Sequence, residues 1–174
     1  MKKLSAFTAF TAIACAALLS SCGVEPTSRV PSLSFAEEAS GCGNLYVYLP
    51  SLDKSEYLVI DASKDQLDLL TRPKTFDLSS GLQGLKVWVD VYSSNPGMTR
   101  YCSDVVTATQ RPAVWSAVSG QVTITISDFS APFNEPYRAT IHLENVTFRD
   151  PAGSATVTLP ARDIKDVVVG WYPG

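Results

Sequence analysis

The stretch Leu85-Lys86-Val87-Trp88-Val89-Asp90-Val91-Tyr92 decides the fold class, because aliphatic residues alternate along it with polar or aromatic ones. Successive side chains of a β-strand point to opposite faces of its sheet. The alternation therefore predicts a strand with one face on the core and the other toward water or a partner.

Further strands are expected on both sides of this stretch, since short β-branched and aromatic runs alternate with turn residues. Helical periodicity is nearly absent, and only residues 64–70 could form a helical turn. The pattern favours an antiparallel β-sandwich of about eight or nine strands with an immunoglobulin-like arrangement. A small β-barrel is the alternative. The predicted strands cover residues 44–49, 57–62, 76–78, 85–92, 101–106, 121–127, 137–149, 155–159 and 166–171.

The longest predicted strand changes its apolar phase part-way along. Apolar residues before position 144 share one parity, and those after position 145 share the other (Ala139, Ile141 and Leu143; Val146 and Phe148). An extra residue in one strand reverses the parity of everything that follows it. We therefore expect a one-residue β-bulge near Glu144 and Asn145, which would return both groups to the core.

The N-terminus carries a secretion signal. Leu19-Ser20-Ser21-Cys22 follows a basic start, Lys2 and Lys3, and a short apolar run that ends at Leu19. This tetrapeptide resembles the lipobox of bacterial lipoprotein precursors at all four positions. The resemblance implies that residues 1–21 are removed as a signal peptide and that Cys22 is acylated, which makes a lipid bilayer its partner. An ordinary cleaved signal is the alternative.

The resemblance also bears on location and on domain boundaries. The residue after Cys22 is Gly23 rather than Asp, which in a Gram-negative bacterium implies the outer membrane, with the domain in the periplasm or at the cell surface. Pro26, Pro31 and several serines follow, so we interpret residues 22–40 as the lipidated cysteine and a flexible tether. Residues 41–174 are expected to form a single domain.

The cysteines then leave one pair for a disulfide. The lipobox resemblance implies that Cys15 leaves with the signal peptide and that Cys22 carries lipid, so Cys42 and Cys102 remain. Export places both in an oxidising compartment, which predicts a Cys42–Cys102 bridge. Two thiolates and a single histidine are too few for a zinc site, so no metal is expected.

Charge excludes one class of partner. Residues 22–174 contain 12 lysines and arginines against 17 acidic residues, a formal net charge of −5. This charge is spread without long runs, which argues against nucleic acid as a partner.

Aromatic residues are the leading candidates for a binding site. Trp88 and Tyr92 occupy the outward parity of the deciding strand, and Tyr46 and Tyr48 share a parity on another. Exposed rings can stack on sugars or peptides, unless a loop covers them. Trp115 lies in a predicted long connection over residues 107–120, and a second connection over 128–136 carries Phe129 and Phe133. Such loops often bind ligands.

Signals for catalysis are weak. The chain has no Gly-x-Ser-x-Gly elbow and no His-Glu-x-x-His motif, and its only histidine, His142, is predicted on a polar strand face. Acidic residues gather in one stretch, which we interpret as a solvated loop and strand edge, with calcium binding as the alternative. They are Asp53, Glu56, Asp61, Asp65 and Asp68.

Together these features predict a lipid-anchored, non-enzymatic module of the cell envelope that binds a protein or a glycan, without a cofactor. Two other classes stay open. An envelope hydrolase that uses paired carboxylates would need a cleft holding both of them. A passive structural or assembly lipoprotein would instead show a flat apolar patch or an unpaired edge strand.

Overall fold

The computed structural model describes residues 29–70, 72–96, 101–103, 110–128 and 136–171. Within these residues the chain forms eight strands and one short 3-10 turn, and every strand pair is antiparallel. The predicted all-β, antiparallel class is thus confirmed. The elements are β1 (Ser40–Cys42), β2 (Tyr46–Pro50), β3 (Glu56–Ala62), β4 (Lys74–Asp77), η1 (Leu78–Ser80), β5 (Leu85–Val91), β6 (Ala113–Ser127), β7 (Tyr137–Arg149) and β8 (Thr156–Val169).

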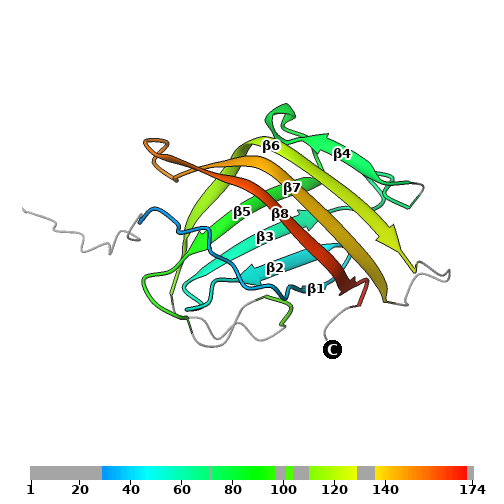
Figure 1. Ribbon diagram of the computed structural model, residues 1–174, viewed down its shortest axis with the longest axis horizontal. Helices are drawn as coiled ribbons and strands as arrows, with labels where there is room; N and C mark the ends of the chain where they lie inside the picture. Colours follow the sequence, from blue (N-terminus) through cyan, green and yellow to red (C-terminus); the bar gives the residue numbers. More distant parts are fainter. Residues whose placement is uncertain (1–28, 71, 97–100, 104–109, 129–135, 172–174) are drawn as a thin grey trace, which may run out of the picture.

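The strands belong to one strongly curled sheet (Figure 1). Hydrogen-bonded neighbours follow the order β1-β2-β3-β5-β6-β7-β8, and β4 pairs with β6 as well. At one end the curl brings the first strand to the last. There Gly43 N–H donates to the Trp171 carbonyl at 2.6 Å, and Gly170 N–H donates to the Gly43 carbonyl at 2.7 Å. The predicted two-sheet, immunoglobulin-like sandwich is not confirmed, because the described strands pair within a single half-barrel.

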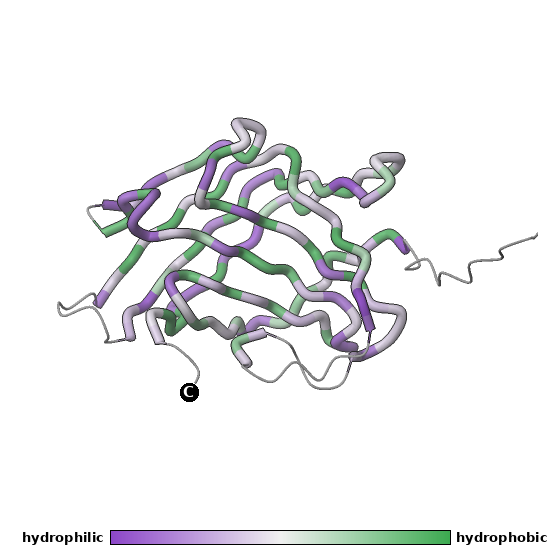
Figure 2. The backbone as a smooth tube through the Cα atoms, turned by 180° about the vertical axis from the view of Figure 1, so that it is seen from behind, coloured by the Kyte–Doolittle hydropathy of each residue, from purple (hydrophilic) through white to green (hydrophobic). Residues whose placement is uncertain are grey.

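The core fills the inside of the curl. Hydrophobic and hydrophilic residues alternate along the strands (Figure 2), and the inward positions of all the long strands meet in one cluster. In β5 the aliphatic residues from Leu85 to Val91 are buried, whereas Lys86 and Trp88 face outward, as the alternation predicts. Each fully buried aliphatic side chain contributes about 1.5–3 kcal/mol, so the parity of these strands fixes which face is inside.

The predicted bulge is present in β7. Asn145 and Val146 lie opposite the single residue Gly120 of β6, and the backbone of Asn145 has a φ of 50°. The apolar residues before and after this point are all buried (Ala139, Ile141, Leu143, Val146 and Phe148). Gly120 allows the close approach, since a Cβ on it would lie 2.6 Å from the Val146 Cα.

Two strands are longer than the sequence predicts. β6 begins at Ala113, so most of the connection expected over residues 107–120 is strand. β8 is continuous and contains Pro160, where two separate strands were expected. Because β8 ends the sheet order, one of its edges lacks a strand partner in the described part of the chain, and a proline is tolerated at such an edge.

Three smaller expectations differ or are untested. Residues 64–70 form turns rather than a helix, and residues 101–103 are not in a strand. Positions 104–106, Phe129 and Phe133 lie outside the described residues, as do Cys22 and the signal sequence.

The region predicted as a tether is largely part of the domain. From residue 29 onward the chain runs along the opening of the curl, between β2 and β8 (Figure 1). Phe35 is 8% exposed and belongs to the core, and it forms a bridge with Ser51. Ala36 N–H donates to the Pro50 carbonyl at 2.8 Å, and the Arg162 guanidinium donates to the Ala36 carbonyl. Residues 29–39 therefore form a seam segment that fills this opening.

The predicted disulfide is confirmed. Cys42 and Cys102 are bonded across a sequence separation of 60 residues, with their Cα atoms 5.7 Å apart. The bond ties residues 101–103 to the end of β1. It thereby holds Tyr101 over the outer face of the sheet.

Candidate ligand-binding groove on the outer face of the sheet

The structure brings the predicted outward aromatics together. Tyr46 and Tyr48 of β2 and Trp88 of β5 border a second apolar cluster, on the face of the sheet opposite the main core. The buried members of this outer cluster are Tyr57, Val59, Tyr92 and Tyr101. The Tyr46 and Trp88 ring centroids lie 6.2 Å apart. Outward parity therefore predicted the correct face.

Tyr101 covers much of this cluster, which the sequence did not predict. Its ring centroid lies 5.0 Å from that of Tyr48 and 4.8 Å from that of Tyr57, and Tyr101 is 3% exposed. The signal that could have revealed it is its position beside Cys102, since the partner Cys42 comes just before β2. A ring attached to that bridge must lie near the aromatics of β2.

Two of the predicted ligand-facing residues are corrected by their burial. Tyr92 is 1% exposed because it packs edge-on against Tyr57, with ring centroids 5.9 Å apart. Trp115 is fully buried in the main core, since it lies on the inward parity of β6 rather than in a loop. Ring surface remains partly accessible at Trp88, Tyr46 and Tyr48.

A buried carboxylate fixes the orientation of Trp88. Asp90 is 2% exposed, and it accepts hydrogen bonds from the Trp88 indole N–H at 3.0 Å and the Tyr101 hydroxyl at 2.5 Å. The Tyr101 and Tyr92 hydroxyl oxygens lie 3.3 Å apart. Burial, with the charge of Asp90 adding to it, raises the pKa of Tyr101 well above its ordinary value, so this hydroxyl keeps its proton.

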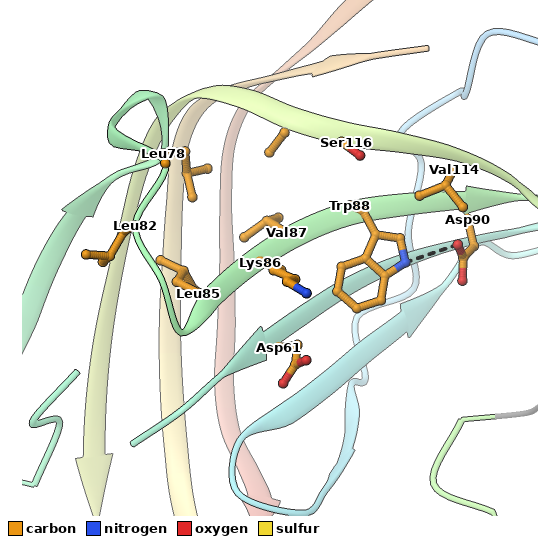
Figure 3. A pocket seen from close by; sticks show the side chains of 12 residues that line it. Asp61, Leu78, Leu82, Leu85, Lys86, Val87, Trp88, Asp90, Val114 and Ser116 are labelled. Carbon is orange, nitrogen blue, oxygen red and sulfur yellow. Dashed lines mark hydrogen bonds between the residues drawn. The ribbon is translucent and has the colours of Figure 1, made fainter. Parts of the chain in front are cut away.

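A groove of about 600 Å³ opens beside Trp88 (Figure 3). It forms because β5 pairs with β6 only from Trp88 onward, while further along β6 the partner is β4. The gap between β5 and β4, the two strands that pair with β6 here, exposes an apolar floor. The apolar residues lining it are Leu78, Leu82, Leu85, Val87, Val114 and Ala117.

Polar groups border the same groove. Asp61 of β3 lies opposite Lys86 of β5 in the strand register, and Ser116 of β6 lies opposite Trp88. Partial burial raises the pKa of Asp61, an effect that the charge of Lys86 opposes. An aromatic ring, an apolar floor and a few polar groups in a space of this size are typical of small-ligand sites, which span about 300–1,000 Å³.

The acidic stretch does not form a metal site in the described residues. Within those residues no group of three or more potential metal-ligating side chains comes together. Glu56 is buried beside Arg29, Asp61 borders the groove, and Asp68 pairs with Lys74 at 2.7 Å.

His142 lies away from the groove, on β7. Its Nδ1 is 2.6 Å from the Asp163 carboxylate of β8, and both side chains are exposed. The hydrogen bond from His142 lowers the pKa of Asp163. Among the described residues, no nucleophilic side chain forms a hydrogen bond with either member of this surface pair.

Comparison with protein-family models, with curated proteins and with solved structures finds no match. Within the described residues, no helix has the length and apolar character needed to cross a bilayer.

Proposed function

We propose that this protein is a lipid-anchored, non-enzymatic binding module of the bacterial cell envelope that holds a glycan in the groove beside Trp88. The lipobox resemblance supports the anchor at Cys22, and Gly23 after it supports the outer membrane in a Gram-negative bacterium. The observation that carries the ligand proposal is a partly exposed indole, oriented by Asp90, at the border of a groove of about 600 Å³.

A sugar ring matches the chemistry of this groove. Its C–H face is apolar and can stack on the flat face of an indole, while its hydroxyl groups need hydrogen-bonding partners around them. Trp88 supplies the ring, and Asp61, Lys86 and Ser116 supply acceptors and donors within the same groove. Because Asp90 already orients the indole, binding costs little side-chain ordering at this position.

Binding is favoured over hydrolysis by the spacing of the carboxylates. Asp61 lies opposite Lys86, which is four residues before Asp90 along β5, so the two acids lie about 13 Å apart along the strands. Glycoside hydrolases place their paired carboxyl groups about 5–10 Å apart. Asp90 is also occupied, since it accepts hydrogen bonds from Trp88 and Tyr101.

A protein partner is the second candidate. Leu82 and Val114 border the groove and are 40% and 39% exposed. Exposed aliphatic groups beside a concave surface favour an apolar side chain of a partner protein. Such a ligand would contact the Leu82 end of the groove more than the polar groups around Lys86.

The test is a binding screen of the soluble mature domain, Cys22→Ser, against bacterial envelope oligosaccharides. We expect Trp88→Ala to abolish binding of the enriched glycan. The control is Trp171→Ala, which removes a more exposed indole just after β8, outside the groove lining. Lys86→Glu is a second groove variant that leaves the outer aromatic cluster intact.

An absence of any enriched glycan would contradict the proposal. So would equal loss of binding in the Trp88 and Trp171 variants. Binding of an envelope protein that depends on Leu82 and Val114 but not on Lys86 would favour the second candidate.

A further inference from the structure

The start of the seam segment is fixed to the turn between β2 and β3. Glu56 is 1% exposed, and its carboxylate accepts hydrogen bonds from the Ser32 N–H at 2.9 Å and the Ser32 hydroxyl at 3.0 Å. Arg29 lies 3.2 Å from the same carboxylate and donates to the Ser55 hydroxyl. A buried carboxylate needs such partners, so these contacts decide where the chain enters the domain.

The chain between the lipidation site and this turn is short. Only residues 23–28 separate Cys22 from Arg29. Seven fully extended residue steps span at most about 25 Å. If Cys22 is embedded through its acyl chains, the turn that binds Arg29 lies within that distance of the bilayer surface.

This end of the molecule also carries the most exposed large aliphatic side chains of the described residues. Leu52, in the turn itself, is 81% exposed, and Val30, between Arg29 and Ser32, is 59% exposed. Exposed aliphatic tips near a bilayer can bury themselves about 5–10 Å into its interface.

The charged residues around Leu52 and Val30 balance one another. Arg29 and Lys54 are offset by Asp53 and Glu56, and the Asp53 carboxylate accepts hydrogen bonds from Ser51 and Ser55. A balanced, apolar surface fits a zwitterionic phospholipid interface and has no need of anionic lipid.

We propose that Leu52 and Val30 contact the bilayer to which Cys22 is anchored, and that this contact sets the orientation of the domain. This inference rests on the proposed anchor and not on the glycan. Along the strands the groove runs from Asp90, which pairs with Tyr57 next to Glu56, to Asp61, about 13 Å further from the turn. The contact would therefore point the Asp61 and Lys86 end of the groove away from the membrane, with the Asp90 end nearer to it.

The experiment uses the full lipidated chain in phosphatidylcholine vesicles that contain nitroxide-labelled lipid. A fluorophore is attached at Lys54→Cys, beside Leu52, and in a separate protein at Asp65→Cys, an exposed position beyond the other end of β3. We expect nitroxide lipid to quench the probe at position 54 severalfold more than the probe at position 65. Adding Leu52→Glu and Val30→Glu should abolish that difference while the protein still floats with the vesicles.

The outcomes separate the two proposals. Equal quenching at both positions, or quenching unchanged by the glutamates, would overturn the bilayer contact while flotation upholds the anchor. Unchanged flotation after Cys22→Ala, compared with the wild-type chain, would overturn the anchor and this inference with it. Glycan binding to the soluble domain is measured independently of either result.

Discussion

Asp90 organises the outer face of the sheet at the scale of single residues. A buried carboxylate is unfavourable unless donors surround it, and two of its donors, Trp88 and Tyr101, come from different parts of the chain. The same contacts hold the indole at the groove and Tyr101 over the outer aromatic cluster. The stability of the fold and the orientation of the indole at the groove therefore both depend on this one side chain.

Tyr101→Phe tests this link. The substitution keeps the ring packing and removes the hydroxyl that donates to Asp90, so we expect the free energy of unfolding to fall by about 1.5–3 kcal/mol. Urea unfolding at neutral pH measures the change. The matched control is Tyr48→Phe, on the partly exposed border of the same cluster, which should change stability by less than about 0.5 kcal/mol. Equal effects of the two substitutions would show that Asp90 does not depend on Tyr101.

At the scale of elements, the bulge in β7 shows how one local irregularity preserves a core. Gly120 contributes twice, because its φ of 112° disfavours other residues and because its missing side chain lets β7 approach. The two contributions can be separated by experiment.

Gly120→Ala should destabilise the fold by at least about 2 kcal/mol, since a Cβ there would meet the Val146 Cα at 2.6 Å. Gly153→Ala is the matched control, with a φ of 76° and open space around the added carbon. It should cost only the strain of the positive φ, about 1–2 kcal/mol. Thermal unfolding of both variants checks this. An equal shift in their melting temperatures would show that the close approach of β7 to Gly120 does not add to the strain of the positive φ.

Elements with a strong local pattern could be predicted from the sequence, and elements set by distant contacts could not. The alternation of β5 and the phase change in β7 are local, and both were predicted correctly. The first half of β6 reads as a loop because Ser116, Ser119 and Gly120 interrupt its apolar pattern, although pairing with β5 and β7 makes it a strand.

The candidate site follows the same division. Parity predicted the face that carries Trp88, Tyr46 and Tyr48. The covering of Tyr92 depends on packing with residues far away in the sequence, and the groove depends on β6 changing partners from β5 to β4. No local sequence pattern predicts the burial of Tyr92 or the presence of the groove.

At the scale of the whole molecule, the seam segment completes the half-barrel. Residues 29–39 lie between β2 and β8, where the curled sheet is open, and contribute Phe35 to the core. A chain that had been predicted to be a spacer is thus part of the fold. The proposed lipid anchor would attach through this segment, which is packed into the domain.

Phe35→Ala should lower the free energy of unfolding by about 3 kcal/mol, because it removes a buried ring and leaves a cavity. Val30→Ala, in the same segment but 59% exposed, should have little effect on the soluble domain. Chemical denaturation compares them. If both variants unfold like the wild type, the segment does not contribute to the stability of the fold.

The most direct test of glycan binding at Trp88 is to monitor the indole N–H signals by NMR while a glycan is added. The chain has three tryptophans, so the indole N–H region of a proton–nitrogen correlation spectrum should contain three signals, from Trp88, Trp115 and Trp171. Titration of the soluble domain with the oligosaccharide enriched in the screen should shift the Trp88 signal and leave those of buried Trp115 and distant Trp171 in place. A glycan that binds without moving the Trp88 signal would contradict the proposed site.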